Sequence, residues 1–171
     1  MIDVITDRLR ILALNEDQLR LAITDFNQLE RALEVSVTVK NIGVREQDVY
    51  KIRLKDMQTN LENYSWYTPW MLIDKSMNRI IGAIMIKNYP DENGEVVIGY
   101  AMQEDFRRKG YMREGVEALV NWMFNNHNVK AVVADTLISN EASYKLLEQI
   151  GMKKYKNDGE CYWWRLANTN L

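Results

Sequence analysis

Residues 107–112, with the sequence Arg-Arg-Lys-Gly-Tyr-Met, have the types and spacing of a turn that binds a phosphate group. They lie between a strand-like run at 95–102 and an amphipathic stretch at 111–124. A turn that opens a helix presents unpaired backbone N–H groups and the positive end of the helix dipole, so it stabilises an anion without any particular side chain. Gly110 allows a close approach of the backbone, and the three basic side chains before it add positive charge.

The spacing of this turn does not fit the phosphate loops of nucleotide-binding proteins. Those loops follow Gly-x-Gly-x-x-Gly or end in Gly-Lys-Ser/Thr, and neither pattern occurs in the chain. The sequence therefore predicts another kind of phosphate-bearing cofactor.

The composition suits one domain that spans residues 1–171. A chain of 20.1 kDa with 47% hydrophobic residues can form a sizeable core. Its 22 basic and 24 acidic side chains give a net charge of −2, so we expect neither nucleic acid nor a membrane surface as a partner. Residues 1–14 lack the apolar core of a signal peptide, and no run approaches the roughly 18 apolar residues of a membrane span. We expect a soluble, cytoplasmic protein.

Metal and thiol chemistry find no support in the sequence. Cys161 is the single cysteine and His127 the single histidine, and neither has the neighbours that a metal site requires. A lone cysteine cannot form an internal disulfide, which fits a reducing compartment. We therefore predict no metal site and no cysteine nucleophile.

Hydrophobic periodicity predicts the elements that position the turn. The predicted strands lie at 5–14, 66–74, 79–87, 95–102, 130–137 and, as a hairpin around Asn157-Asp158-Gly159, at 155 and 161–166. The predicted helices lie at 45–60, 111–124 and 141–149, with a further one that starts after the Asn15 cap and continues through Leu33. Strands and helices thus alternate in the manner of a mixed α/β fold.

Three motifs occur in a fixed order along the second half of the chain: Val97-Ile98-Gly99-Tyr100, then residues 107–112, then Asn140-Glu141-Ala142-Ser143 through Gly151-Met152. Together they resemble the GNAT (GCN5-related N-acetyltransferase) superfamily, and most of all its ribosomal-protein N-acetyltransferase branch. The resemblance covers residues 95–152. Residues 6–10, Thr-Asp-Arg-Leu-Arg, resemble the opening strand of that branch, whereas residues 15–75 match only in element order.

The resemblance implies an α/β (α+β) GNAT fold, with a mixed, mostly antiparallel sheet of about seven strands flanked by about four helices. Its fourth and fifth strands, which hold Tyr100 and Val133, are expected to splay apart and admit the pantetheine arm of acetyl-CoA like an added strand. The implied activity is transfer of an acetyl group from acetyl-CoA directly to a primary amine in a ternary complex. The amine is a protein N-terminus or a small molecule such as a polyamine or an aminoglycoside.

In the family the phosphate loop has the form Arg/Gln-x-x-Gly-x-Gly/Ala, and its amides hold the pyrophosphate. Arg107 and Gly110 match this form, whereas Met112 replaces the usual small residue. A bulge near Ala101 and Met102 is expected to aim a backbone N–H at the thioester carbonyl, where it stabilises the oxyanion. The cofactor-binding residues carried over are Tyr100, Ala101, Met102, Arg107, Arg108, Lys109, Gly110, Tyr111, Met112, Asn140 and Ser143.

The leaving thiolate needs a proton or a hydrogen bond. The tyrosine that many members use falls at Leu147 in this chain, so the resemblance assigns the role to Ser143. Tyr144 is the alternative, although neighbouring side chains on a helix diverge by about 100° and both cannot face one sulfur. For Asn140 two interpretations stay open, a contact with the pantetheine arm and a plain helix N-cap.

The attacking amine must lose a proton, so a base is expected near the thioester. Glu95, on the strand that leads to the cleft, is the first candidate, and Glu160 in the last hairpin is the second. For each of them the alternative is a solvated surface carboxylate, which ordinary exposure statistics favour.

Two hypotheses other than an enzyme remain open. One is a regulatory module that binds acyl-CoA without turnover, and the other is a domain held by its aromatic core with no cofactor. The tryptophans are interpreted as packing in the core or in a homodimer rather than as ligand contacts; those concerned are Trp66, Trp70, Trp163 and Trp164.

Overall fold

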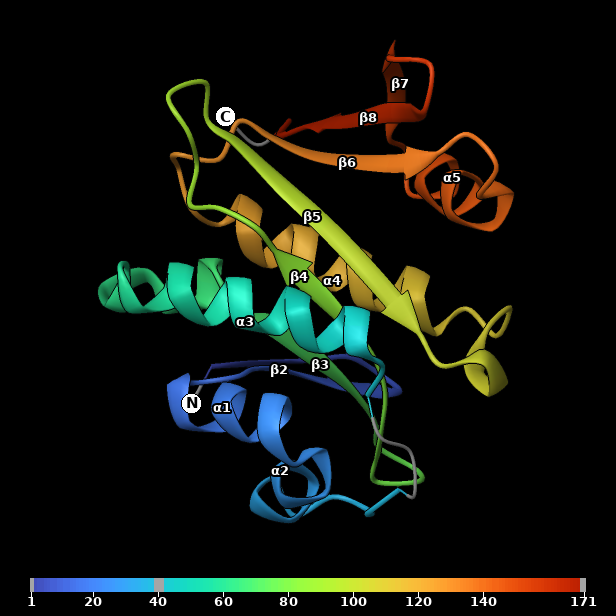
Figure 1. The fold of residues 1–171 in the computed structure, drawn as a ribbon. Coiled ribbons are helices and arrows are strands. Elements are labelled where there is room, and N and C mark those ends of the chain that lie inside the picture. Colours follow the sequence, from blue (N-terminus) through green and yellow to red (C-terminus); the bar gives the residue numbers. More distant parts are fainter. Residues whose placement is uncertain (1, 39–41, 170–171) are drawn as a thin grey trace.

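The computed structural model describes residues 2–38 and 42–169, and within them it contains eight strands and five α-helices (Figure 1). The helices are α1 (Glu16–Thr24), α2 (Phe26–Ala32), α3 (Val44–Gln58), α4 (Tyr111–Phe124) and α5 (Glu141–Gln149), with short 3-10 turns η1 (Leu61–Trp66) and η2 (Glu104–Phe106). The strands are β1 (Asp3–Ile5), β2 (Leu9–Ala13), β3 (Pro69–Asp74), β4 (Arg79–Ile86), β5 (Glu95–Met102), β6 (Ala131–Leu137), β7 (Lys153–Asn157) and β8 (Cys161–Ala167).

All eight strands belong to one sheet with the order β1-β2-β3-β4-β5-β6-β8-β7. Every neighbouring pair is antiparallel except β5 and β6, which are parallel. Helix α4 lies on one face of the sheet and α3 on the other (Figure 1). The predicted mixed, mostly antiparallel sheet is therefore confirmed.

Alternation along β2 divides the core between the two faces of the sheet. Leu9 and Ile11 belong to the same buried cluster as Leu119 of α4, whereas Leu12 belongs to the cluster that contains Leu19 of α1. Successive side chains of a strand point to opposite faces, so one short strand serves both layers.

The parallel pairing of β5 with β6 is short. It joins residues 95–98 to residues 131–134 and ends there. Beyond Ile98, β5 stays paired with β4, and beyond Ala134, β6 stays paired with β8. The sheet thus opens between these two strands, as the family resemblance implied, and the opening leads towards α5 and the start of α4 (Figure 1).

The count of strands differs from the prediction because residues 5–14 form no single strand. Thr6 turns the chain between β1 and β2: its N–H donates to the Leu9 carbonyl at 2.9 Å, and its hydroxyl accepts from the Leu9 N–H at 2.9 Å. The splayed strands are consequently the fifth and sixth of eight rather than the fourth and fifth of seven.

The helix predicted from Asn15 through Leu33 is two helices. Asp25 lies between α1 and α2 with an extended backbone (φ −154°, ψ 95°), and its carboxylate accepts from the Gln28 N–H at 3.1 Å. A side chain that caps a new helix favours a break at that point over continuation.

The tryptophans mostly pack in the core, as expected. Trp66 lies in η1 rather than in the predicted strand, which begins only at Pro69. Its ring and that of Trp70 pack against Trp122 of α4 at centroid distances of 5.0 and 4.7 Å. Trp163 is the exception, because it is half-buried and its indole N–H donates to Asp158 at 2.7 Å. No helix within the described residues is both long and apolar enough to span a membrane.

The packing of α4 on the sheet should contribute substantially to stability, because the helix buries one face in the core; it also positions the predicted phosphate turn. Replacing Leu119, which is 0% exposed, by alanine is expected to lower the free energy of unfolding by about 2–5 kcal/mol in urea titrations. Leu61→Ala is the matched control, since Leu61 is 61% exposed and its truncation should change stability by less than about 0.5 kcal/mol. Equal losses in the two variants would contradict this account of the core.

Candidate active site

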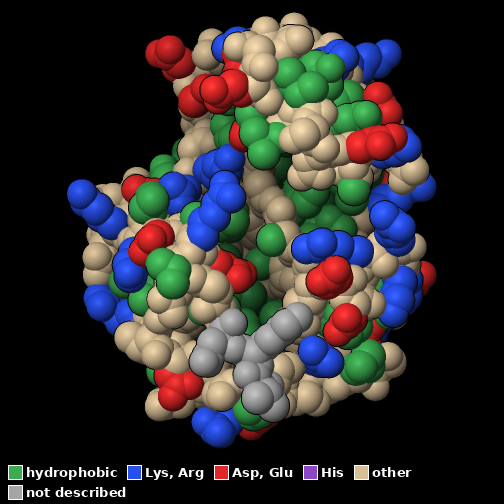
Figure 2. All heavy atoms as spheres, turned by 45° about the vertical axis from the view of Figure 1, so that its right-hand side comes forward, with side chains coloured by type: hydrophobic (Ala, Val, Ile, Leu, Met, Phe, Trp, Pro, Cys, Tyr) green, Lys and Arg blue, Asp and Glu red, His purple; other side chains and the backbone are tan. Residues whose placement is uncertain are grey.

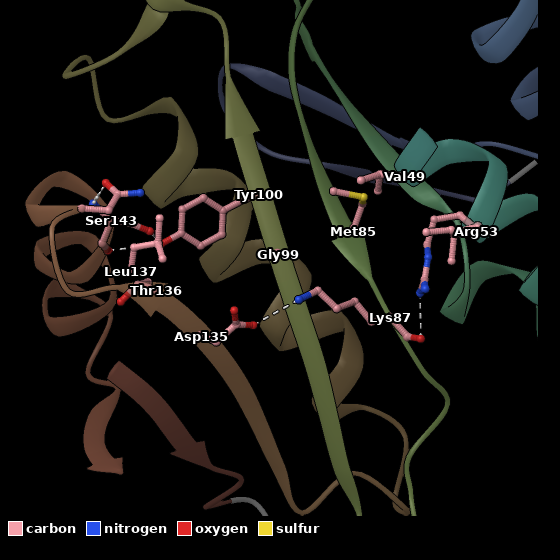
Figure 3. A pocket seen from close by; sticks show the side chains of 12 residues that line it. Val49, Arg53, Met85, Lys87, Gly99, Tyr100, Asp135, Thr136, Leu137 and Ser143 are labelled. Carbon is pink, nitrogen blue, oxygen red and sulfur yellow. Dashed lines mark hydrogen bonds and ion pairs between the residues drawn. The ribbon is translucent and has the colours of Figure 1, made fainter. Parts of the chain in front are cut away.

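A cavity of about 430 Å³ lies where β5 and β6 separate (Figure 3). Seen in Figure 2, this side of the molecule is hollowed, with hydrophobic side chains inside the hollow and Lys and Arg side chains beside it. The cavity is lined from α3, β4, β5, β6 and α5 by Val49, Ile52, Arg53, Met85, Lys87, Gly99, Tyr100, Asp135, Thr136, Leu137, Asn140 and Ser143. Three of the predicted site residues, Tyr100, Asn140 and Ser143, are thereby brought together.

The predicted phosphate turn forms a second part of the site, at the start of α4. Gly110 has φ +81° and Arg108 has φ +60°, and the first backbone bond of the helix runs from the Glu114 N–H to the Gly110 carbonyl at 3.1 Å. The N–H groups of residues 111–113, which come before this first bond, have no partner within the helix. Residues 107–110 are exposed, so the basic side chains that precede the helix are accessible to an anion.

Met112 does not obstruct this turn. Its side chain is 8% exposed and belongs to the core cluster beneath α4, so only its backbone faces the turn. Tyr111 is also occupied, because its hydroxyl bonds to Asp74, and this hydrogen bond raises the pKa of the Tyr111 phenol. Met112 therefore departs from the family form without placing its side chain in the phosphate turn.

The edge of β5 connects the turn with the cavity. Alternate residues of β5 bond on the side of β4. The Val97 carbonyl accepts from the Lys87 N–H, just beyond β4, at 2.9 Å, and the N–H of Gln103, just beyond β5, donates to the Ile81 carbonyl at 2.9 Å. Antiparallel alternation then turns the backbone groups of Tyr100 and Met102 away from β4, towards the opening. Arg107 ties the end of this edge to the turn, because its Nε donates to the Met102 carbonyl at 3.1 Å.

The bulge expected near Ala101 and Met102 is absent. The register between β4 and β5 is regular over residues 98–102. The irregularity lies one strand further, between β3 and β4, where Ile81 is the extra residue. The N–H of Met102 faces the opening through ordinary alternation, whereas the backbone of Ala101 faces β4.

Tyr100 and Ser143 meet across the opening. Their side-chain oxygens are 2.7 Å apart, and the Tyr100 hydroxyl also lies 3.1 Å from the Ser143 carbonyl. Burial raises the pKa of Tyr100 to about 12, although the hydrogen bond with Ser143 counteracts this in part. A neutral phenol and a serine hydroxyl can therefore form a short relay of hydrogen bonds.

The start of α5 separates Ser143 from Tyr144. Ser143 lines the cavity, whereas the Tyr144 ring stacks on Trp164 with centroids 6.3 Å apart. Asn140 caps the helix, since its Oδ1 accepts from the Ser143 N–H at 3.2 Å, and it also lines the cavity. The N-cap interpretation of Asn140 is confirmed, and its amide group still faces the site.

A charged pair occupies the floor of the cavity. The Lys87 ammonium crosses β5 and lies 3.1 Å from Asp135 Oδ1 on β6 (Figure 3). Gly99 leaves room for this crossing, because a β-carbon there would stand 3.2 Å from Lys87 Cε, a tight contact. Arg53 of α3 also lines the cavity. It pairs with Asp56 at 2.7 Å and donates to the Lys87 carbonyl at 2.9 Å.

Neither carboxylate predicted as the base lies at the cavity. Glu95 begins β5, at the end remote from the opening, and pairs with Arg165 at 2.7 Å. Glu160 is exposed in the turn before β8. Asp135 is the carboxylate that lines the cavity, and sequence reasoning missed it. One signal was available, because Asp135 interrupts the otherwise apolar run Ala-Val-Val-Ala-Asp of a buried strand.

Among the residues that the structure describes, no group of three or more His, Cys, Asp or Glu side chains is placed to hold a metal ion. Partial burial, together with the nearby carboxylates of Asp158 and Asp135, raises the pKa of Cys161, which disfavours a thiolate.

The arrangement matches a known family. Residues 8–153 of the 171 match the model of the acetyltransferase (GNAT) domain, and the chain belongs to this family. The three ordered motifs at residues 97–152, the opened sheet and the turn before α4 all fall within the matched residues.

Curated relatives carry corresponding names. The chain is 32% identical over 98 residues to the uncharacterized N-acetyltransferase YjdG of Bacillus subtilis (strain 168), a match that covers 57% of this chain and 58% of that protein. It is 26% identical over 124 residues to the uncharacterized N-acetyltransferase YnaD of the same organism, covering 70% of this chain and 69% of YnaD. The match thus spans less than two thirds of the length of YjdG.

Solved structures establish the fold over the whole chain. The ribosomal-protein-S5-alanine acetyltransferase of Vibrio fischeri superimposes with a TM-score of 0.69 at 18% identity, covering 99% of this chain and 98% of the other. The ribosomal L7/L12 α-N-protein acetyltransferase RimL, solved with coenzyme A, gives 0.66 at 14% identity, covering 97% and 98%. At these identities the likeness is one of fold.

The Tyr100 phenol should remain neutral far above the usual range. In a near-ultraviolet pH titration, the difference between wild type and Tyr100→Phe is expected to show one phenol ionising near pH 12 rather than near 10. Because the folded pKa is raised, wild type should lose about 2 kcal/mol of stability relative to Tyr100→Phe as the pH rises from 10 to 12. Ionisation near pH 10 would mean that the phenol is open to solvent, because burial is what raises its pKa.

Proposed function

We propose that this chain is an acetyl-CoA-dependent N-acetyltransferase, with residues 1–171 acting as one domain, that transfers the acetyl group directly to a primary amine. The observation that carries the proposal is the unpaired edge of β5 beyond Ile98: Gly99 and Tyr100 line the cavity, and the strand ends at Met102, whose carbonyl accepts from Arg107 of the turn. A phosphate-binding turn and an unpaired strand edge joined in this way suit a long, flexible cofactor with a phosphate group at one end.

Different residues bind different parts of the cofactor. The N–H groups of residues 108–112 and the side chains of Arg108 and Lys109 hold the pyrophosphate. The backbone of Tyr100 and the amide of Asn140 hold the pantetheine arm, and the N–H of Met102 or Tyr100 donates to the thioester carbonyl. Such donors stabilise the negative charge that develops on that oxygen during attack.

Asp135 is the proposed general base. Its carboxylate lines the cavity, and only one of its oxygens, the one near Lys87, has a hydrogen-bond partner among the described residues. The second oxygen can accept a proton from the ammonium of the acceptor, directly or through one water. The free amine then attacks the thioester carbon, the C–N bond forms and the C–S bond breaks.

Ser143 donates a hydrogen bond or a proton to the leaving thiolate. Tyr100 supports it, since a phenol that donates to Ser143 Oγ leaves the serine proton directed at the sulfur. This pair takes the place of the tyrosine that would fall at Leu147, a residue that is 0% exposed in the core.

The cavity also bears on the choice of acceptor. Two cationic side chains, Lys87 and Arg53, accompany the single carboxylate of Asp135 on its lining. A polyamine carries several ammonium groups that these cations would repel, so we favour a protein N-terminus or a small molecule with one amine. The names of the structural neighbours do not choose between these acceptors, because they include ribosomal-protein acetyltransferases and a spermidine N-acetyltransferase.

The cofactor assignment rests on the phosphate turn, so Gly110→Asp should weaken acetyl-CoA binding at least about tenfold in calorimetric titrations, because it adds charge and bulk against the pyrophosphate. Gly159→Asp is the matched control: Gly159 also has a positive φ, +95°, but lies in the β7–β8 turn with open space around it. Unchanged affinity in Gly110→Asp, or no binding by wild type, would overturn the proposal. Binding without amine-dependent release of CoA would favour a regulatory module.

The base assignment is tested by two carboxamide variants. Asp135→Asn should lower kcat/KM about 100-fold or more through loss of proton abstraction, while acetyl-CoA affinity stays near that of wild type. Glu95→Gln should leave kcat/KM within about threefold, because Glu95 pairs with Arg165 away from the cavity. The reverse ranking of the two variants would return the role to Glu95.

A further inference from the structure

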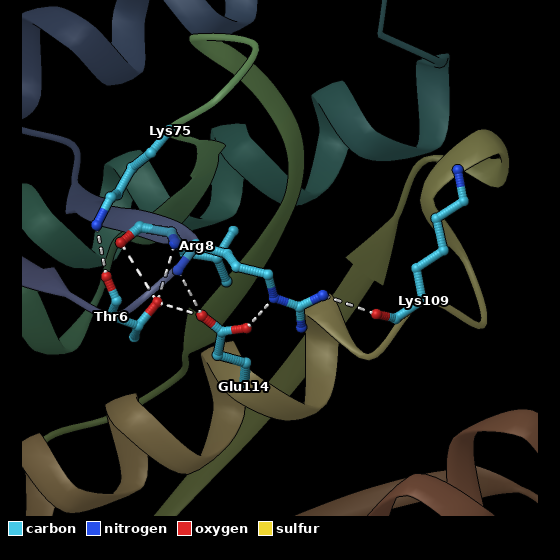
Figure 4. Close-up of polar contacts among 6 residues, drawn as sticks. Thr6, Arg8, Lys75, Lys109 and Glu114 are labelled. Atoms are coloured by element: carbon cyan, nitrogen blue, oxygen red, sulfur yellow. Dashed lines mark hydrogen bonds and ion pairs between the residues drawn. The ribbon is translucent and has the colours of Figure 1, made fainter.

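The opening motif of the chain, Thr6-Asp7-Arg8-Leu9-Arg10, has no role in the proposed chemistry. In the structure it forms the turn between β1 and β2 and the start of β2, and this hairpin lies beside the start of α4 (Figure 4). Lys75, which directly follows β3, stabilises this turn, since its ammonium donates to the Thr6 carbonyl at 2.8 Å. A segment from the beginning of the chain is thereby placed next to the phosphate turn.

Arg8 makes the contacts between the two segments. Its Nε donates to Glu114 Oε2 at 2.6 Å and its Nη1 donates to the Lys109 carbonyl at 3.0 Å. The guanidinium also lies over the Tyr111 ring, 4.3 Å from its centroid. Contacts in three directions hold the planar group in one orientation, which a flexible ammonium would not reproduce.

Glu114 would oppose an anion if it were alone in the first turn of α4. Burial by itself would raise its pKa, but hydrogen bonds from the Thr6 hydroxyl (2.6 Å), the Arg8 N–H (3.0 Å) and the Arg8 side chain outweigh burial and lower the pKa. The carboxylate therefore stays ionised, and its charge is directed at Arg8 and Thr6 rather than at the turn.

The contact with the Lys109 carbonyl orients a donor. In a planar trans peptide the N–H points away from the C=O, so a carbonyl held towards Arg8 turns the N–H of Gly110 to the opposite, exposed side. The third guanidinium nitrogen, Nη2, makes no hydrogen bond within the described part of the chain. It would lie 3.4 Å from a β-carbon placed on Gly110, so it adds its charge to the turn itself.

We propose that Arg8 is a positioning residue of the cofactor's phosphate site: it orients the Lys109–Gly110 peptide, neutralises Glu114 and adds positive charge at the turn. The inference rests on the proposed acetyl-CoA site. It concerns the phosphate end of the cofactor alone, because Arg8 does not line the cavity that receives the acetyl group.

The experiment compares two ligands that differ in phosphate. Acetyl-CoA carries the pyrophosphate and S-acetylpantetheine does not, and the affinity of each is measured by calorimetric titration of the full chain. Arg8→Gln should weaken acetyl-CoA about tenfold to a hundredfold and leave S-acetylpantetheine unchanged. Arg8→Lys should restore only part of the loss, because an ammonium cannot hold Glu114 and the Lys109 carbonyl in one fork.

Arg10→Gln is the matched control, since Arg10 lies on the same hairpin with similar exposure and pairs with Asp3 at 3.2 Å. It should leave both affinities near those of wild type. An Arg8→Gln variant that binds acetyl-CoA like wild type would overturn the inference, and so would an equal loss for both ligands, which indicates a general structural role. Failure of wild type to bind acetyl-CoA is a different result, because it removes the proposed function itself.

Discussion

The end of pairing between β5 and β6 after Ile98 and Ala134 is the constraint on which the rest of the structure depends. A backbone polar group left without a partner away from water costs about 1–3 kcal/mol, so a sheet opens in its middle only where solvent or a ligand reaches the free groups. Here each strand keeps its other neighbour, and the side chains of Tyr100 and Ser143 bridge the opening. The opening supplies both the cavity and the free edge of β5.

The phosphate turn depends on the packing of α4 as much as on its own residues. Met112 and Leu119 anchor the helix in the core, which sets the direction of its positive dipole end. Gly110 supplies the left-handed backbone, and Arg8, in the turn between β1 and β2, donates to the preceding carbonyl, that of Lys109. A loop that is exposed is thus given one conformation by buried contacts below it and charged contacts beside it.

Charge in this protein is arranged locally. The net charge is only −2, yet basic side chains gather at residues 107–109, and Lys87 and Asp135 form a pair on the cavity lining. Gly99 leaves room for Lys87 to cross β5 and reach Asp135. Local arrangements of this kind decide which ligands bind, whereas a small net charge says little beyond the absence of a general attraction to polyanions.

The sequence by itself determined the elements with strong local signals. Residues 95–102, 111–124 and 141–149 have the predicted bounds, because periodicity, Gly110 and the Asn140 cap act over a few neighbouring residues. The break at Asp25 was missed because the cap there competed with a continuous apolar stripe. Only the tertiary structure brought Asp135 to the cavity, removed Glu95 from it and placed Arg8 against α4. These placements follow from which strands pair and where pairing ends, and no local pattern encodes a contact between residues 101 positions apart.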